Sequence, residues 1–223
     1  MDERYARTVK MTGEEGLERI IAAKVLIVGV GGVGSFAAEA IARAGAGSIT
    51  LIDGDTVQPS NLNRQLVALT STLGRNKAEV MAERIRDISP DTEVTALARF
   101  YREGDELDLT AFDWIVDAID DVNAKTALIC RAKAQNVNII SAMGAAGKFW
   151  TDFKVADIND TSVCPLAKVM RKRLKNAGVK DLPVVYSEEK PVPRDGDLGS
   201  LSYVPGSAGL TLAGYVIRQI AGI

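Results

Sequence analysis

A glycine-rich turn and a carboxylate one strand later have the spacing of a nucleotide-binding site. The segment 29–34 (Gly-Val-Gly-Gly-Val-Gly) follows the apolar run 24–28, and Asp53 closes the next apolar run, 48–52. In this pattern the glycines allow a tight turn, a close approach of phosphate and close packing of a helix on a strand. Free N–H groups at the helix start attract phosphate, and Asp53 can accept hydrogen bonds from ribose hydroxyls. The glycines that we expect to contact a nucleotide are Gly29, Gly31, Gly32 and Gly34.

The polar stretch after Asp53 favours a nucleoside triphosphate over a dinucleotide such as NAD. Arg64 offers planar, permanently charged donors to phosphate oxygens. Lys77, expected one turn into the next helix, can place a point charge against another phosphate. We therefore expect ATP to bind here. The further residues of the predicted ATP site are Asp55, Asn61, Asn63 and Gln65.

A second group of carboxylates follows the expected strand 112–118. Asp120 would lie at the carboxyl end of that strand, near the point where ligands bind in open α/β sheets. It is well placed to hold Mg²⁺ on the phosphates. The alternative is that Asp120 caps the expected helix 122–135, although Asp121 or Asn123 could cap it instead.

Strand-like and helical patterns alternate through the first two thirds of the chain. This alternation predicts an α/β fold with a doubly wound, mainly parallel, Rossmann-like sheet. The expected strands are 24–30, 48–53, 92–98, 112–118 and 137–142. The expected helices are 32–45, 74–88 and 122–135.

The last third lacks regular crossover helices, so we expect a mixed or antiparallel C-terminal extension of the sheet. Residues 189–200 are the best candidate for a mobile loop. The strands expected in this part are 149–156, 183–188 and 201–205. The helices expected here are 165–177 and an apolar closing helix over 207–222.

Composition narrows the class of protein. The 223 residues carry a net charge of −2, so no global basic field demands nucleic acid, although a local basic patch remains possible. No transmembrane run or signal peptide is visible. Histidine is absent, and Cys130 and Cys164 form neither a zinc motif nor a disulfide framework. We expect a reduced, cytoplasmic protein without zinc.

The ordered set of glycine turn, Asp53–Gln65 segment, Lys77 and Asp120 resembles the ubiquitin-activating-like adenylating enzymes. That family includes the activators of the ThiS and MoaD sulfur carriers. The resemblance implies binding of ATP and Mg²⁺ and activation of a carboxylate as an adenylate. It also implies a homodimer in which an N-terminal arginine reaches the partner's ATP site. Arg7 is the candidate for that role, with Arg4 in reserve; an ordinary surface arginine is the alternative.

Within that family, four segments are most similar to the branch that dehydrates and cyclises N6-threonylcarbamoyladenosine in tRNA. The resemblance implies one domain over 1–223, with an arm and helix at 1–22, a nucleotide-binding part at 23–145 and a substrate-side part at 146–223. It implies Asp before Pro165, where this chain has Cys164. The segments that carry the likeness are 13–17, 39–45, 77–85 and 187–189.

A tRNA substrate needs a cationic surface, and the expected helix 165–177 offers one. Its alternative reading is a solvated face that binds nothing. The tRNA-binding candidates are Lys168, Arg171, Lys172 and Lys175. The apolar stripe that would pack this helix is Leu166, Val169, Met170 and Leu174.

Three other functions stay open. The chain could adenylate the C-terminal glycine of a ubiquitin-like sulfur carrier, with a carrier or sulfur-transfer protein as partner. Those activators usually carry two Cys-x-x-Cys pairs, which this sequence lacks. The chain could also be a non-catalytic module that keeps a nucleotide pocket, or an NAD enzyme. The intact set of Arg64, Lys77 and Asp120 argues against the non-catalytic module, and nothing in the sequence resembles the partner site of a hydride transfer.

Overall fold

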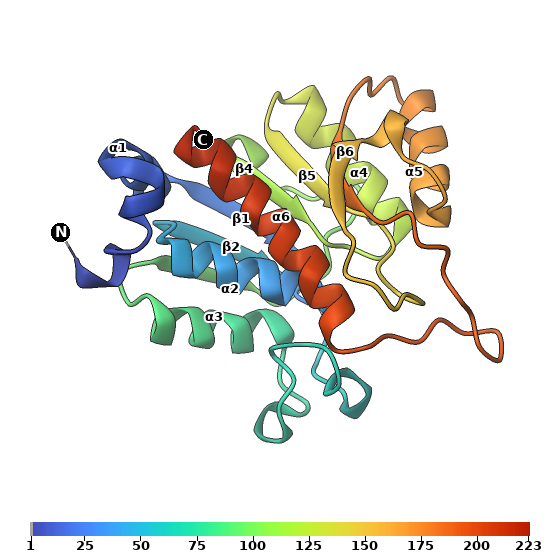
Figure 1. Ribbon diagram of the computed structural model, residues 1–223, viewed down its shortest axis with the longest axis horizontal. Helices are drawn as coiled ribbons and strands as arrows, with labels where there is room; N and C mark the ends of the chain where they lie inside the picture. Colours follow the sequence, from blue (N-terminus) through green and yellow to red (C-terminus); the bar gives the residue numbers. More distant parts are fainter. Residues whose placement is uncertain (1) are drawn as a thin grey trace.

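The computed structural model describes residues 2–223 and contains one sheet in the order β3-β2-β1-β4-β5-β7-β6 (Figure 1). Neighbouring strands run parallel except β6, which is antiparallel to β7. The expected parallel sheet with a mixed extension is therefore confirmed. The strands are β1 (Lys24–Val28), β2 (Ser48–Ile52), β3 (Glu93–Leu97), β4 (Trp114–Asp117), β5 (Asn138–Ala142), β6 (Lys154–Asp157) and β7 (Pro183–Tyr186).

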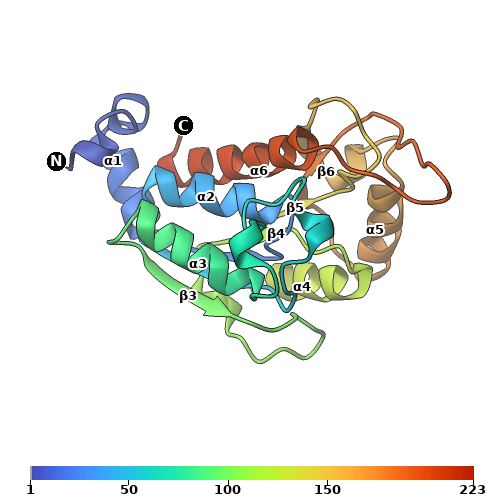
Figure 2. The same cartoon turned by 90° about the horizontal axis from the view of Figure 1, so that it is seen from below.

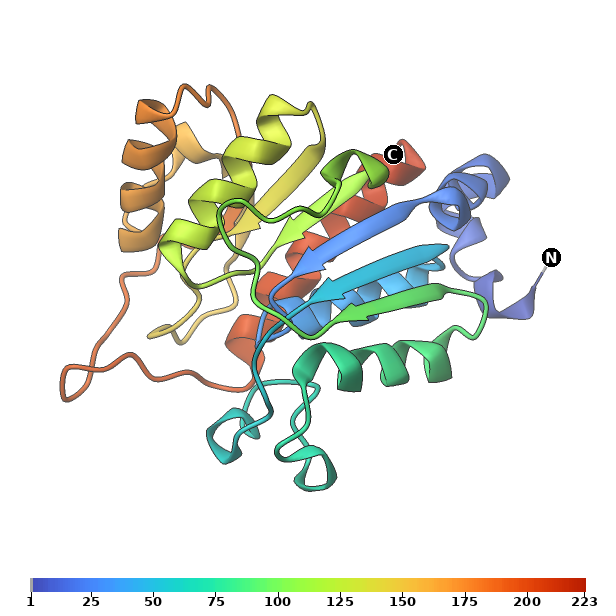
Figure 3. The ribbon, with the colours of Figure 1, turned by 180° about the vertical axis from the view of Figure 1, so that it is seen from behind.

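Helices cover both faces of the sheet. On one face α2 lies between α3 and α6 (Figure 2), and α1 packs against α6. On the other face α4 covers β4 and β5, and α5 packs beside α4 (Figure 3). The helices are α1 (Val9–Ala22), α2 (Gly34–Ala44), α3 (Lys77–Ile88), α4 (Val122–Ala134), α5 (Pro165–Asn176) and α6 (Tyr203–Ala221).

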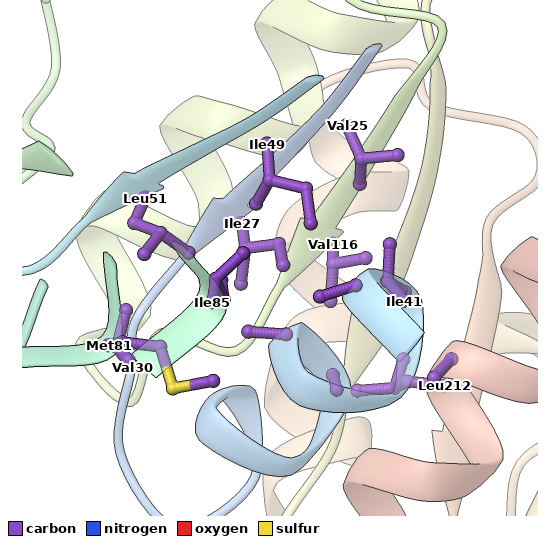
Figure 4. Close-up of a cluster of buried hydrophobic side chains, with 14 of the residues drawn as sticks. Val25, Ile27, Val30, Ile41, Ile49, Leu51, Met81, Ile85, Val116 and Leu212 are labelled. Atoms are coloured by element: carbon purple, nitrogen blue, oxygen red, sulfur yellow. The ribbon is translucent and has the colours of Figure 1, made fainter. Parts of the chain in front are cut away.

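Alternating side chains of β1 supply the two hydrophobic cores. Val25 and Ile27 face the core under α2, α3 and α6 (Figure 4), whereas Leu26 and Val28 face the core under α4 and α5. All four are at most 2% exposed. A strand buried on both faces reads as a continuous apolar run, which is why this strand was recognisable from sequence.

The C-terminal part differs from expectation at two elements. The strand expected over 149–156 is β6, which covers only Lys154–Asp157. The strand expected over 201–205 is wrong, because α6 begins at Tyr203. Val204 is buried and Pro205 stands in the first helical turn, where its missing N–H costs nothing. Residues 189–200 form no helix or strand and contain one isolated bridge, between Arg194 and Asp197.

The N-terminal arm lies at the amino-terminal edge of the sheet. The Tyr5 hydroxyl is 3.3 Å from Ser89 Oγ, just before β3, and the Tyr5 ring lies against Gly45, just before β2. The strand arrowheads point away from this arm (Figure 3). The arm and the carboxyl ends of the strands are thus on opposite edges. No helix within residues 2–223 has the length and apolar character needed to cross a membrane.

Candidate active site

A cavity of about 1250 Å³ opens at the carboxyl ends of the strands. This is the edge where open parallel sheets bind ligands. Its walls come from segments far apart in sequence. They are the glycine turn after β1, the stretch after β2, residues 99–103, residues 118–121, the segment after β5, the start of α5, and residues 198–200.

The glycine turn needs glycine at two positions for separate reasons. Gly29 has φ +89°, a left-handed conformation that side chains disfavour. A Cβ on Gly34 would lie 1.8 Å from the Gly29 carbonyl oxygen, so α2 can start this close to the turn only with glycine there. Gly31 and Gly32 line the cavity, as the spacing predicts for residues that approach a phosphate.

Asp53 is fixed beside this turn at the end of β2. Its carboxylate accepts hydrogen bonds from the backbone N–H groups of Val30 (2.7 Å) and Asp55 (2.8 Å). Asp53 is only 8% exposed, and burial raises its pKa above the ordinary value. The result is a pre-positioned acceptor at the cavity wall.

Lys77 reaches the same region from the start of α3. The helix begins at Lys77, later than the expected residue 74, because the Asn76 side chain caps it by accepting from Ala78 N and Glu79 N. Lys77 Nζ donates to the Asp55 carboxylate at 2.9 Å, and its side chain is 7% exposed. A buried ammonium is thereby held at the cavity by one half-exposed carboxylate.

Gln65 carries the clearest mark of a missing partner. Its side-chain oxygen is buried and is the one buried side-chain acceptor without a hydrogen bond among residues 2–223. Its amide nitrogen would lie 3.7 Å from a Cβ on Gly31, and the residue lines the cavity. Buried acceptors of this kind are rare unless a ligand or water donates to them. The site therefore offers one acceptor to a donor group of a ligand.

Arg64 and Asn63 join the site to the late loop. Arg64 Nη1 donates to the Ser60 carbonyl at 2.8 Å and to the Asn63 side-chain oxygen at 2.9 Å. The Asn63 amide nitrogen donates to the Ser200 carbonyl at 2.9 Å. Both polar ends of Asn63 are thus engaged within the protein, while Arg64 keeps further N–H donors toward the cavity.

The carboxylates after β4 have separate positions. Asp121 caps α4 by accepting from Ala124 N at 2.7 Å, which leaves the exposed Asp120 free to face the cavity. Asp117 is fully buried: its carboxylate accepts from Lys125 Nζ at 2.8 Å and from Ser141 Oγ at 2.6 Å. Asp117 also accepts from Ile119 N at 3.1 Å, so this buried pair anchors the 118–121 segment.

The ThiF family model matches residues 5–223. The chain belongs to the ThiF family. The tRNA threonylcarbamoyladenosine dehydratase of Bacillus subtilis is 38% identical, over 99% of this chain and 95% of that protein. The crystal structure of the E. coli tRNA N6-threonylcarbamoyladenosine dehydratase in complex with ATP is similar with a TM-score of 0.91 and 34% identity, over 99% of this chain and 94% of that chain. The E. coli sulfur carrier protein ThiS adenylyltransferase is 32% identical over 65% of this chain and 60% of that protein.

The cavity of this ThiF family chain gathers most, but not all, of the residues expected at an ATP site. Gly34 packs against the turn instead of lining the cavity. Asn61 is also outside it, because its side-chain oxygen accepts from Gln58 N and caps a short 3₁₀ helix. Arg7 is exposed on the arm at the opposite edge, and Arg4 is engaged by Asp2 and Asp91. Those that line the cavity are Gly29, Gly31, Gly32, Asp53, Asp55, Asn63, Arg64, Gln65, Lys77 and Asp120.

Helix α5 packs as expected at Leu166, Met170 and Leu174 and differs from expectation at two residues. Arg171 is half-buried and donates to the carbonyl of Thr161 at 2.6 Å and to its hydroxyl at 2.7 Å, so it braces the preceding loop. Val169, expected in the apolar stripe, is 44% exposed, and Ala167 is buried in its place. The basic candidates that are exposed are Lys168, Lys172 and Lys175.

Two groups of cavity residues escaped the sequence analysis. Residues 99–102 (Arg-Phe-Tyr-Arg) follow β3, and the Phe100 ring lies against Gly54. Their position after a strand was a usable signal, since the carboxyl ends of β2 and β3 are neighbours. Lys148 lines the cavity from the turn after β5. No local pattern marks this lysine, because its burial depends on the late loop.

Proposed function

We propose that this chain is an ATP-dependent enzyme that adenylates the carboxylate of N6-threonylcarbamoyladenosine in tRNA and closes it into a ring. One observation carries the proposal: a single cavity is lined by the glycine turn, the buried Lys77 and Gln65, whose buried side-chain oxygen has no hydrogen-bond partner. The family membership and the similarity to dehydratases over nearly the whole chain supply the substrate class.

In this proposal the nucleotide lies over the glycine turn. Asp53 accepts from the ribose hydroxyls, and Gln65 accepts from a donor of the nucleotide. The phosphates meet the backbone at Gly31 and the cations of Arg64 and Lys77. Lys77 exchanges its contact with Asp55 for a phosphate oxygen, which its three donors permit.

Mg²⁺ fits the donor set under this assignment. No cluster of three or more acidic, histidine or cysteine ligands exists within residues 2–223, and Mg²⁺ bound to a nucleotide commonly uses one or two carboxylates plus phosphates. Asp120 would hold the ion from the segment that Asp117 anchors. When bound, Mg²⁺ neutralises charge that develops on the phosphates.

The proposed chemistry has two steps. A carboxylate oxygen of the threonyl group attacks the α-phosphorus of ATP, and pyrophosphate leaves. A group of the same modification then attacks the activated carbonyl carbon, closes the ring and expels AMP. The net result is the loss of one water from the nucleoside against conversion of ATP to AMP and pyrophosphate. The protein binds, orients and shields the reactants, and no enzyme thiol is needed.

The N-terminal arm has a role only in a homodimer under this proposal. Arg7 lies at the edge of the sheet opposite its own cavity, so it can serve only the site of a second copy. A planar guanidinium from the partner would then add charge at the phosphates.

We assign tRNA phosphates to the exposed lysines of α5 and place the enzyme in the cytoplasm. Lys168, Lys172 and Lys175 offer charge without interleaved aromatic rings, which suits phosphate contacts.

The alternative function, activation of a ubiquitin-like sulfur carrier, has weaker support. The ThiS adenylyltransferase matches a smaller share of this chain than the dehydratase does.

The direct test is release of AMP and pyrophosphate by the purified protein with ATP and Mg²⁺. We expect release with tRNA that carries threonylcarbamoyladenosine and none with the same transcript lacking the modification. A purified ThiS-type carrier protein serves as the competing substrate. Adenylation of the carrier releases pyrophosphate while AMP stays on its C-terminal carboxylate, so pyrophosphate release with the carrier alone would favour the alternative. Pyrophosphate release with neither substrate would refute adenylation of both.

A further inference from the structure

The cavity extends well beyond the residues assigned to the nucleotide. Its second half is walled by the segment after β5, the first turn of α5 and residues of the late loop. Between β2 and β5 lie β1 and β4. Neighbouring strands are about 4.8 Å apart, so the carboxyl ends of β2 and β5 are separated by roughly 14 Å.

Lys148 is the buried cation of this second half. It is 4% exposed, lines the cavity, and its Nζ donates to the Glu189 carbonyl oxygen. No carboxylate lies within 4.0 Å of Nζ in the part of the chain that the structure describes. The nearby Glu189 carboxylate is occupied by Phe149 N (2.8 Å) and Trp150 N (3.0 Å).

Burial of a cation without an anionic partner is costly. The pKa of Lys148 is lowered from its ordinary value because burial disfavours the charged form, an effect that Cys164 and Glu189 oppose. An anionic group placed in the cavity next to Nζ would remove this cost. Lys148 therefore makes the second half of the cavity suited to binding an anion.

The start of α5 points to the same ligand. Cys164 occupies the N-cap position without a side-chain hydrogen bond, and Pro165 has no N–H to satisfy. Both line the cavity with Leu166, and Cys164 Sγ would lie 3.6 Å from a Cβ on Gly144, so this helix end forms the wall beside the turn that carries Lys148. The uncapped N–H groups of a first helical turn attract anions.

We propose that Lys148 and the first turn of α5 form a subsite for an anionic oxygen group of the acceptor substrate, separate from the cations that hold the ATP phosphates. The inference rests on the proposed function. Two groups of the acceptor carry this chemistry: the threonyl carboxylate and a phosphodiester beside the modified nucleotide.

Three probes separate the two sources. They are the nucleoside N6-threonylcarbamoyladenosine, its methyl ester, and an anticodon-loop oligonucleotide that carries the modification. Binding of each is measured by calorimetry in the presence of a non-hydrolysable ATP analogue, for the wild type, Lys148→Met and Lys24→Met. Lys24 is an exposed lysine at the opposite edge of the sheet, which makes it the matched control.

Lys148→Met should bind the acceptor group roughly tenfold or more weakly, since a charge-assisted hydrogen bond is lost. Affinity for the ATP analogue should stay within twofold, and Lys24→Met should match the wild type. If the group is the carboxylate, the wild type prefers acid over ester and Lys148→Met loses that preference. If the group is the phosphodiester, the wild type binds the oligonucleotide more tightly than the nucleoside, and Lys148→Met loses this difference in affinity.

Wild-type affinity of Lys148→Met for all three probes would overturn the inference alone. A wild type that binds ATP but none of the probes would instead overturn the proposed function, so the two failures are distinguishable. Lys148→Arg keeps the charge and should retain acceptor binding. It tests the subsite by the same acid and ester preference if the methionine variant does not fold.

Discussion

The β1–β2 side of the cavity is held mainly by contacts between residues near in sequence, with the Asn63–Ser200 contact as the long-range exception, whereas the β5–β7 side is held by contacts across the chain. Asp53 meets Val30 at a separation of 23 residues, and Lys77 meets Asp55 at 22. By contrast, Lys148 meets Glu189 at a separation of 41 residues. The first side is a compact motif that can be read from the sequence, and the second depends on how the late loop folds back.

The two sides also differ in the group that partners their buried lysine. On the nucleotide side a carboxylate already balances Lys77, and a phosphate can take its place. On the acceptor side a backbone carbonyl is the partner of Lys148. We therefore expect changes on the nucleotide side to stop the chemistry and changes on the acceptor side to weaken capture of the acceptor.

The largest expected effect is on Asp120→Ala. Loss of the carboxylate that we assign to Mg²⁺ should lower adenylation by roughly 10²- to 10³-fold while the fold stays intact. Pyrophosphate exchange measures the loss. The control is Asp121→Ala, which removes the cap of α4, costs about 1 kcal/mol of stability and should spare turnover. Near wild-type exchange by Asp120→Ala would remove Asp120 from the chemistry.

Lys77→Met should weaken ATP binding by roughly tenfold or more, because a buried charged donor to phosphate is lost. Affinity for tRNA should be unchanged, since Lys77 lies on the nucleotide side. Calorimetry with ATP and with tRNA gives both values, and NAD should give no binding in the wild type. Equal ATP affinity in variant and wild type would contradict the assignment of phosphates to this side.

The double change Lys172→Glu and Lys175→Glu should affect tRNA binding and leave ATP binding unchanged, the opposite of Lys77→Met. Binding of tRNA should weaken, and the slope of log affinity against log salt should fall by about one for each lost phosphate contact. ATP affinity should not change. Arg171→Ala is the contrasting variant, because it should lower the melting temperature through Thr161. An unchanged salt slope in the double variant would mean that this face of α5 is exposed to solvent and does not contact tRNA.

A mixed dimer tests whether the N-terminal arm joins the nucleotide side of a second copy. Subunits with Arg7→Ala and subunits with Asp120→Ala should each be inactive alone. In a heterodimer one site keeps both residues, so up to about half of the wild-type activity should return. Purified heterodimers with differential tags give the measurement. Absence of any recovery would argue that Arg7 does not act across subunits.

Local signals explain what could be predicted. The strand, the glycine turn and Asp53 follow from steric and hydrogen-bonding needs within one βαβ unit, so both the sheet and most of the nucleotide side were accessible from sequence. The cap at Asp121 was likewise one of the foreseen alternatives. Each of these features depends on few contacts, and each contact requires a particular type of residue.

The misses share a dependence on distant partners. Arg171 was a candidate for tRNA binding, but its guanidinium donates to the Thr161 carbonyl in the loop before α5. Asn61 looked like a ligand, but it caps a short helix. Residues 201–205 were expected to form a strand, but α6 begins at Tyr203 and Val204 is buried as part of that helix. Hydrophobic periodicity predicts which face of a helix or strand is apolar, but it does not predict which other segment packs against that face.

Nucleoside mass spectrometry of tRNA tests the central claim most directly. The tRNA that carries N6-threonylcarbamoyladenosine is incubated with the purified protein, ATP and Mg²⁺, digested and compared with a sample that received Asp120→Ala. The account predicts that the wild-type protein converts the nucleoside into a form that has lost one water, with AMP formed in equal amount. Unchanged nucleoside alongside an intact, ATP-binding protein would contradict it.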